Sequence, residues 1–350
     1  MVNKNYRLIF VANVTALACL YLATFMINAF YDPLCCFLLF PSANRPVPVV
    51  DSRLQKTNHL VHGPANHSAL LLGSSRAEQL RQQDFTPLRT FNYAAPSFYP
   101  DEASEYLDFF IKKNSVKPTT VFLGLDFYGS NLLMHEHAKP PRHYIETCSY
   151  PLGAFKTAVS HDTLKYSLRV AKGKRDMFMY DPLTLDKLTI VQGAAESDKL
   201  LRRQLEVYRK EFYGDYRYNE NYAATLRKLK DGHPDLQFVV FTTPVSKQLF
   251  KLLVASGRIP DYERWLKDVV DIFGSVYNFM IIDPLTSNQG NFLDAHHLYP
   301  ERSAPVARIV SGHPQPQDKG IGRLVTTRNI SAHIAEVRAQ VKQLTQEKQP

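Results

Sequence analysis

Residues 69–80 read ALLLGSSRAEQL, and this stretch decides how the chain is expected to fold. An apolar run ends at Gly73, two serines follow, and the residues from Arg76 onward are expected to begin a helix. A short apolar run that leads into a helix is typical of a strand in a parallel sheet covered on both faces. Adjacent serines at that junction favour either an N-cap for the helix or a catalytic nucleophile.

The chain that follows alternates between short apolar stretches and amphipathic stretches. The predicted strands are residues 68–73, 89–93, 119–125, 237–242 and 277–282. The predicted helices are residues 100–113, 198–231, 246–256, 260–273, 301–311 and 326–346. Because parallel strands are joined by right-handed helical crossovers, this order predicts an α/β fold, a three-layer α/β/α sandwich around a parallel sheet.

An uncharged apolar stretch, residues 8–30, precedes all of these elements. It is long enough to cross a bilayer core of about 30 Å as a helix. Lys4 and Arg7 lie before it and Asp32 after it, which predicts a cytoplasmic N-terminus and a main domain outside the cytoplasm. A cleaved signal peptide and a buried helix of a soluble domain are the alternatives, but the stretch exceeds the usual h-region of about 7–15 residues. We therefore expect a single-pass anchor in the lipid bilayer, whereas the apolar patch 34–41 is too short to span and is expected at the interface or packed on the domain.

Composition limits the class of protein. The chain has 350 residues, of which 45% are hydrophobic, enough for one large domain or at most two. A net charge of +9 is compatible with an acidic partner or an anionic membrane surface, but no zinc-spacing motif, RNA-binding signature or dense basic patch accompanies it, so no nucleic-acid partner is predicted. The cysteines, Cys19, Cys35, Cys36 and Cys148, do not form the pattern of a disulfide framework.

The predicted organisation has four parts. These are a cytoplasmic tip and transmembrane anchor (1–32), a juxtamembrane linker that leads to a docking helix (33–66), the α/β domain (67–315), and a C-terminal helix and tail (316–350). Residues 127–197 interrupt the alternation of strands and helices, so we expect an insertion that forms a cap or an irregular subdomain over the sheet edge.

Two groups of polar residues follow predicted strands. Ligands of doubly wound sheets bind beyond the carboxyl ends of the strands, where the serines of the first strand lie. The second group is FLDAHHLYP at 292–300, after the last predicted strand, and it contains Asp294 and His297 in the spacing D-x-x-H. An aspartate in this position can accept from the imidazole Nδ1–H, which leaves Nε2 free to take a proton from a serine. One alternative is a surface loop without a catalytic role. Another is a metal site made of Asp294, His296 and His297, but such a site would require more ligands nearby.

Together the two groups resemble the blocks of the SGNH (GDSL-type) hydrolases over about residues 68–311, and most of all those of the membrane-anchored bacterial envelope branch. That resemblance implies an SGNH-like α/β fold with Ser75 as nucleophile, His297 as base and Asp294 as the residue that orients it. His296 is the second choice for the base, because Asp294 is only two residues away. No cofactor and no metal are implied.

The remaining blocks of the family match less well. In the stretch 91–100, Asn92 is expected to hold a loop from which Ala94 or Ala95 offers a backbone N–H to the oxyanion. In the stretch 122–131, Asp126 stands where the third block begins and Asn131 is the nearest asparagine. Asp126 follows a buried strand, so its carboxylate needs a partner. Arg76 is expected to pair with Asp126 or Glu78, or else to bind an anionic substrate.

The resemblance implies a serine esterase, deacetylase or O-acyltransferase that acts on an envelope or cell-surface glycan from the bacterial inner membrane, with the main domain in the periplasm. A membrane protein that donates acyl groups is the partner this implies. The alternative is a catalytically weak or inactive member that binds glycan or protein within a polysaccharide modification or export complex. A third hypothesis, a purely structural membrane-tethered adaptor, does not require Ser75 to meet His297.

Overall fold

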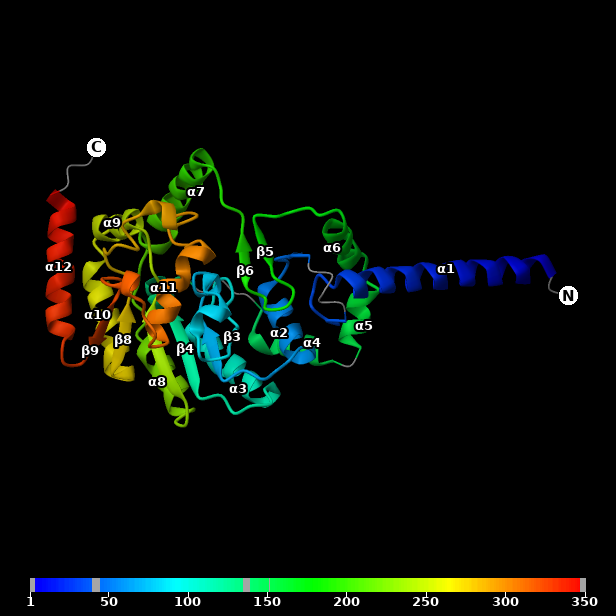
Figure 1. The fold of residues 1–350 in the computed structure, drawn as a ribbon, viewed down its shortest axis with the longest axis horizontal. Helices are drawn as coiled ribbons and strands as arrows, with labels where there is room; N and C mark the ends of the chain where they lie inside the picture. The colour runs from blue at the N-terminus through cyan, green and yellow to red at the C-terminus, as the bar shows by residue number, and fades with distance from the viewer. Residues whose placement is uncertain (1–3, 40–44, 135–138, 151, 347–350) are drawn as a thin grey trace. The chain divides into compact units, whose positions relative to one another are not determined.

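The computed structural model describes residues 4–39, 45–134, 139–150 and 152–346 (Figure 1). Residues 40–44 of the predicted linker, residues 135–138 and 151 of the predicted insertion, and both chain ends therefore lie outside the described residues. The chain divides into two compact units. Unit 1 comprises residues 1–64 and 142–188, and unit 2 comprises residues 65–141 and 189–350.

Helices make up much of the described chain. The α-helices are α1 (Lys4–Tyr31), α2 (Ser52–His62), α3 (Ala103–Lys113), α4 (Pro141–Ser149), α5 (Gly153–Ala158), α6 (His161–Ala171), α7 (Ala194–Val207), α8 (Tyr222–Asp231), α9 (Lys247–Ala255), α10 (Ile259–Phe273), α11 (Pro300–Val310) and α12 (Ile330–Gln346). Short 3₁₀ helices span Ala77–Gln79, Gln82–Phe85, Pro100–Glu102, Phe127–Ser130, Gln289–Asn291 and Pro316–Asp318. One π-helical turn, Tyr208–Phe212, directly continues α7.

Unit 2 is built on a six-stranded sheet with strand order β3-β2-β4-β7-β8-β9. Its strands are β2 (Ala69–Leu72), β3 (Thr90–Asn92), β4 (Thr120–Leu125), β7 (Gln237–Thr242), β8 (Ser275–Asn278) and β9 (Arg323–Thr326). All neighbouring strands are parallel except β8 and β9, which pair antiparallel. The carboxyl ends of β2, β4 and β7 therefore meet at one edge, from which Gly73, Asp126 and Thr243 follow.

Helices cover both faces of this sheet. On one face, Leu71, Phe122 and Phe241 belong to one buried apolar cluster with Val306 and Val310 of α11. Successive side chains of a strand point to opposite faces, so Leu70 and its partner Phe91 lie on the other face. There the ring of Phe91 stacks on Phe110 of α3, 6.2 Å between centroids. The mixed α/β fold with a mostly parallel sheet is thus confirmed.

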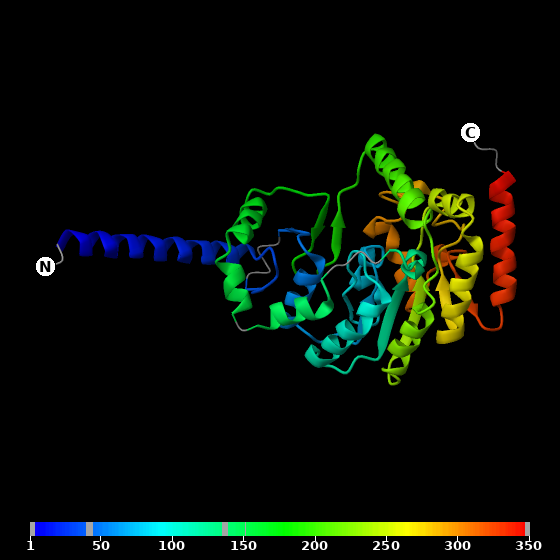
Figure 2. The same cartoon turned by 180° about the vertical axis from the view of Figure 1, so that it is seen from behind.

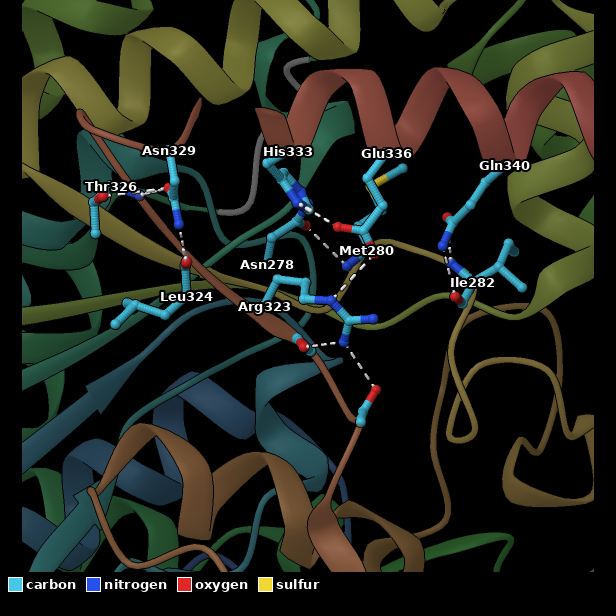
Figure 3. Close-up of polar contacts among 12 residues, drawn as sticks. Asn278, Met280, Ile282, Arg323, Leu324, Thr326, Asn329, His333, Glu336 and Gln340 are labelled. Carbon is cyan, nitrogen blue, oxygen red and sulfur yellow. Dashed lines mark hydrogen bonds and ion pairs between the residues drawn. The ribbon is translucent and has the colours of Figure 1, made fainter. Parts of the chain in front are cut away.

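The C-terminal helix α12 packs on the antiparallel edge of unit 2 (Figure 3). The Asn278 amide lies 2.8 Å from His333 Nε2, and the Gln340 side chain exchanges two hydrogen bonds with the backbone of Ile282. Glu336 lies 3.1 Å from Arg323 of β9. The sheet and its edge helix therefore continue beyond residue 315, where the domain was predicted to end.

Unit 1 contains the apolar helix α1, which is long and apolar enough to cross a membrane. Helix α1 lies near the N-terminus, where a signal sequence would meet the same criteria of length and hydropathy. Helices α2, α5 and α6 belong to the same unit, together with strands β1 (Val47–Pro48) and β5 (Phe178–Tyr180), which pair antiparallel, and β6 (Lys187–Thr189), which completes a small sheet and ends at the boundary with unit 2. Leu34, Cys35 and Cys36 of the second apolar patch are buried here, and all four cysteines of the chain are free.

Three predicted elements are wrong. No α-helix begins near Arg76, where the chain forms only the three-residue 3₁₀ helix Ala77–Gln79. The predicted helix 198–231 is broken over residues 213–221, because the Asn131 side chain binds the carbonyl groups of Phe212 and Asp215 and the N–H of Arg217. The predicted strand 277–282 ends at Asn278, because the Thr242 hydroxyl accepts the next two backbone N–H groups.

Candidate active site

Ser75 lies in the tight turn that follows β2. This turn depends on Gly73, whose φ of +152° is rarely adopted by residues with a side chain. A Cβ atom at this position would lie 2.7 Å from Ala77 Cβ and 2.9 Å from Gly124 O. The Ser74 hydroxyl accepts a hydrogen bond from the Arg76 N–H, which stabilises the turn and leaves the Ser75 side chain outside it.

Ser75, His297 and Asp294 form one continuous chain of hydrogen bonds. Ser75 Oγ lies 2.8 Å from His297 Nε2, and His297 Nδ1 lies 2.8 Å from Asp294 Oδ2. Asp294 Oδ1 accepts the backbone N–H groups of His296 and His297, each at 2.9 Å. A carboxylate that accepts at Nδ1 requires a proton there, so Nε2 carries the lone pair that can accept the Ser75 proton.

The Asp294 carboxylate is buried and charged. Burial opposes its charge, but the His297 side chain and the hydrogen bond from the His296 backbone N–H outweigh burial and hold the pKa of Asp294 well below its usual range. The side chain of Asp294 is only 7% exposed and that of His297 14% exposed. Asp294 can therefore orient His297 and stabilise the imidazolium that forms when His297 takes a proton.

His296 lies beside this chain without joining it. Its ring packs on His297 at 4.0 Å between centroids and on Tyr208 at 5.1 Å. Its Nδ1 is buried, lies 3.8 Å from Asp294 Oδ1 and has no hydrogen-bond partner in the described part of the chain. Burial lowers the pKa of His296 well below its ordinary value, so the ring is neutral and the structure selects His297 as the partner of Ser75.

Arg76 and Asp126 form a buried ion pair next to Ser75. Arg76 Nη1 lies 3.2 Å from Asp126 Oδ1, and both side chains are almost fully buried. The Thr243 hydroxyl contacts both partners, and Arg76 Nη2 donates to the Tyr208 hydroxyl. Burial disfavours the charged guanidinium, but Tyr208 and Asp126 outweigh it and raise the pKa of Arg76. Of the two predicted partners, Arg76 thus pairs with Asp126.

A cavity of about 260 Å³ opens beside Ser75. Tyr99, Tyr128 and Met134 line one part of it, and Tyr208 and Phe212 of the π-helical turn line another. Arg76 and His296 also reach the cavity. Its wall thus combines aromatic rings with polar and charged groups, which also include Gln204 and Glu211. Such a surface suits an organic group that carries both apolar and hydrogen-bonding parts.

The predicted oxyanion donors are not available, which corrects the sequence analysis. The Ala94 N–H donates to Asn92 Oδ1 at 3.0 Å, and the Ala95 N–H donates to Gly73 O at 3.0 Å. Asn131 is fully buried, and its amide holds the irregular segment after the π-helical turn instead of reaching Ser75. Asn92 does hold a loop, since its amide also donates to the carbonyl groups of Ala77 and Leu80.

Two other donors lie near Ser75. Its own backbone N–H has no acceptor among the residues that the structure describes. Arg76 Nε is buried and likewise has no hydrogen-bond partner in the described chain. These groups can face a developing negative charge at low cost, because neither would have to give up an existing bond.

Sequence reasoning missed the tyrosines of the site. Tyr208 and Tyr128 both lie close to the Arg76 guanidinium, with ring centroids 5.7 Å and 5.2 Å from Cζ. Burial raises the pKa of Tyr208 to about 12, so its hydroxyl stays protonated. Tyr208 lies in a stretch read as ordinary amphipathic helix, and no local pattern marks it. The π-helical turn, a feature often found at functional sites, appears only in three dimensions.

Asp294, His296 and His297 could also hold a metal ion, because their ligand atoms lie within 4.8 Å of one another. The two oxygens of Asp294, however, already accept bonds from two backbone N–H groups and one imidazole. A metal ion would have to replace the His297–Asp294 bond and would gain only these three ligands from the cluster. The donor set therefore fits a hydrogen-bonded triad better than a metal centre.

Comparison with known proteins finds no matching family model, no matching curated protein and no matching solved structure.

Proposed function

We propose that this chain is a membrane-anchored serine esterase or O-acyltransferase with Ser75, His297 and Asp294 as its catalytic triad. The observation that carries the proposal is the bond of 2.8 Å between Ser75 Oγ and His297 Nε2, continued at the same length from Nδ1 to Asp294. A nucleophile, a base within reach and a third residue that orients the base are the parts that acyl transfer requires.

In this reaction Ser75 Oγ attacks the carbonyl carbon of an ester, and His297 Nε2 takes the serine proton. Collapse of the tetrahedral intermediate breaks the bond to the leaving alcohol, which receives that proton from His297. The acyl group remains on Ser75 until water or a second hydroxyl attacks it with His297 again acting as base. Esterases and acyltransferases differ only in this acceptor.

The oxyanion of the intermediate would be stabilised by the Ser75 N–H and the Arg76 guanidinium. Arg76 supplies a charge fixed by Asp126 and Tyr208, and it lines the same cavity as Ser75. The resemblance to the SGNH hydrolases implies a glycine N–H and an asparagine side chain as donors, and the site departs from that pattern. Loss of one oxyanion donor typically costs about 10²–10³-fold in rate.

The SGNH-like architecture, the bacterial inner membrane as location and a periplasmic main domain are parts of the same proposal. The apolar helix α1 supports an anchor, and the order of Ser75 after β2 and Asp294–His297 after β8 supports the fold family. A glycan of the cell envelope suits an enzyme tethered to the membrane, and a membrane protein would deliver the acyl group if the reaction is transfer.

Labelling with a fluorophosphonate probe tests the proposal, since this probe reacts with activated serines. We expect the full-length protein to be labelled and the Ser75→Ala variant not to be. Ser74→Ala is the matched control, because it removes the neighbouring hydroxyl and should keep the label. Equal labelling of the parent and Ser75→Ala, or none of the parent, would contradict the assignment of Ser75.

A second candidate function is a binding component without turnover. The observation in its favour is that the N–H groups of Ala94 and Ala95 and the amide of Asn131 are already bonded elsewhere. The two functions are separated by complementation of a deletion strain. If Ser75→Ala and His297→Ala restore the cellular phenotype of the intact gene, the site binds and does not catalyse.

A further inference from the structure

We infer that helix α5 of unit 1 lies in the membrane–water interface and forms a second contact with the lipid bilayer. The contact surface, here called the α5 rim, consists of Tyr150, Leu152, Phe155 and Lys156. This inference rests on the proposed transmembrane role of α1, and the partner it names is the lipid surface itself.

The α5 rim is an exposed apolar surface. Tyr150, Leu152 and Phe155 are 51%, 53% and 54% exposed, although all three lie within one short stretch of chain. Exposed apolar side chains that gather in this way mark contact surfaces, whereas scattered ones need no explanation. Within the same unit α5 lies beside the carboxyl-terminal part of α1, as Figures 1 and 2 both show.

Contacts with α1 determine the depth of the rim. The ring of Phe155 lies 6.0 Å from that of Phe25. One turn further along α1, Asn28 is buried, donates to the carbonyl groups of Ala158 and Ser160, and accepts from the Ser167 hydroxyl. Because the Asn28 amide makes hydrogen bonds to residues of both α5 and α6, it holds these helices at one position along the axis of α1.

This position along α1 is expected near the edge of the hydrocarbon core. The uncharged apolar part of α1 begins at Leu8, after Arg7, and the axial distance from Leu8 to Phe25 is about 26 Å at about 1.5 Å per residue. The hydrocarbon core of a bilayer is about 30 Å thick. When Leu8 lies at one surface of the core, Phe25 lies within about one helical turn of the other surface, and Phe155 lies next to Phe25.

The chemistry of the α5 rim matches this position. Tyrosine is enriched at membrane–water interfaces, where its ring contacts acyl chains and its hydroxyl contacts water. Lys156 Nζ lies 5.3 Å from the centroid of the Tyr150 ring, so a cation accompanies the aromatic group. A lysine can extend its ammonium to lipid phosphates while its carbon chain stays with the apolar side chains. The rim thus offers apolar groups to the membrane and a positive charge to its headgroups.

Tryptophan fluorescence in lipid nanodiscs tests this inference on the full-length protein. The single tryptophan, Trp265, is fully buried and gives a constant background that the parent protein defines. We expect Phe155→Trp to give blue-shifted emission that is lost when the phosphatidylcholine carries bromine near the headgroup end of its acyl chains. Leu152→Trp is the second variant and should behave alike, in case Phe155→Trp does not fold.

Two further variants make the outcomes distinct. Leu183→Trp is the matched control, because Leu183 is 51% exposed in the same unit but contacts α2, and its emission should not be lost. Leu17→Trp reports on α1 itself and is measured in lipid brominated near the end of the acyl chains, because Leu17 lies about 14 Å along the helix from Leu8, near the middle of a hydrocarbon core of about 30 Å. Quenching at 17 without quenching at 152 and 155 would overturn the inference and leave the anchor standing. Absence of quenching at 17 would overturn both.

Discussion

Ser75 and His297 lie 222 residues apart in the chain, yet Ser75 Oγ and His297 Nε2 lie 2.8 Å apart in the fold. The two residues follow β2 and β8, strands separated in the sheet by β4 and β7. Their meeting therefore depends on the loop after β8 reaching back over the carboxyl edge of the sheet. Within this loop the Leu293 N–H donates a hydrogen bond to His297 O, so Asp294 and His297 lie in one compact turn.

Replacement of Asp294 by asparagine should abolish most turnover while the loop keeps its shape. The new amide oxygen can still accept the N–H groups of His296 and His297, but its NH₂ group would face His297 Nδ1. His297 would then be protonated at Nε2 and unable to accept the Ser75 proton. We expect a loss of about 10³–10⁴-fold in kcat for ester hydrolysis.

The control for this variant is Asp283→Asn, which changes another buried carboxylate that accepts backbone N–H groups. Its kcat should match that of the parent even if its stability falls. Equal rates for Asp294→Asn and the parent would show that His297 does not act through Asp294.

Arg76→Ala should destabilise unit 2 more than any surface ion-pair variant. The substitution leaves the buried Asp126 carboxylate without its cation, and removal of one partner from a buried pair costs about 3–5 kcal/mol. Lys117→Ala breaks an exposed pair with Asp235 and should have no measurable effect. Urea denaturation of both variants gives the comparison. A stability of Arg76→Ala near that of the parent would mean that Asp126 is neutral or solvated.

Gly73→Ala should lower both stability and turnover. A residue with a Cβ atom is disfavoured at this position, both because φ is +152° and because Ala77 and Gly124 lie too close to the Cβ position. Gly257→Ala separates the two effects, because Gly257 has a φ of +70° with nothing near its Cβ position. We expect Gly257→Ala to cost about 1 kcal/mol and Gly73→Ala clearly more, with loss of turnover in Gly73→Ala only. Thermal melts and ester hydrolysis measure the two properties.

Much of unit 2 could be predicted from local sequence. The strands β2, β4 and β7 consist largely of short apolar runs, and burial on both faces produces that pattern. The placement of Ser75 and His297 follows from strand order, because residues after parallel strands meet at one edge. Neither inference needs knowledge of side-chain packing.

The oxyanion donors could not be predicted because they depend on which N–H groups remain unbonded. Ala94 and Ala95 lie in the predicted loop, but their backbone N–H groups donate hydrogen bonds to Asn92 Oδ1 and Gly73 O. Whether a backbone N–H is engaged is a property of the tertiary fold and leaves no local pattern. The same holds for Tyr208, which reaches Arg76 across 132 residues of chain.

The division into two units also could not be predicted from local sequence patterns. Residues 142–188 group with residues 1–64 through long-range contacts such as Asn28 with Ser167 and Tyr180 with Ser52. The sequence pattern shows only that the strand–helix alternation stops there. Strand β9 was missed because RLVT pairs antiparallel after a long irregular stretch, and four residues of mixed character carry a weak signal.

The stability of unit 2 should fall on acidification, and His333 should account for part of the fall. The amide of Asn278 is oriented by Thr242 and Met280, which donate to its oxygen, so its nitrogen must donate to His333 Nε2 (Figure 3). Protonation of Nε2 would set two donors against each other. Burial, partly offset by Glu336, accordingly lowers the pKa of His333 below 6.5 in the folded protein. The unfolded chain then binds the proton more readily, so the contribution of His333 to stability is complete above about pH 6.5 and declines as the pH falls below it.

In His333→Gln the side-chain oxygen can still accept a hydrogen bond from Asn278 but does not titrate. We therefore expect the decrease in Tm between pH 7 and pH 5 to be smaller in this variant than in the parent, whereas equal decreases would show that His333 is not protonated on unfolding in this range.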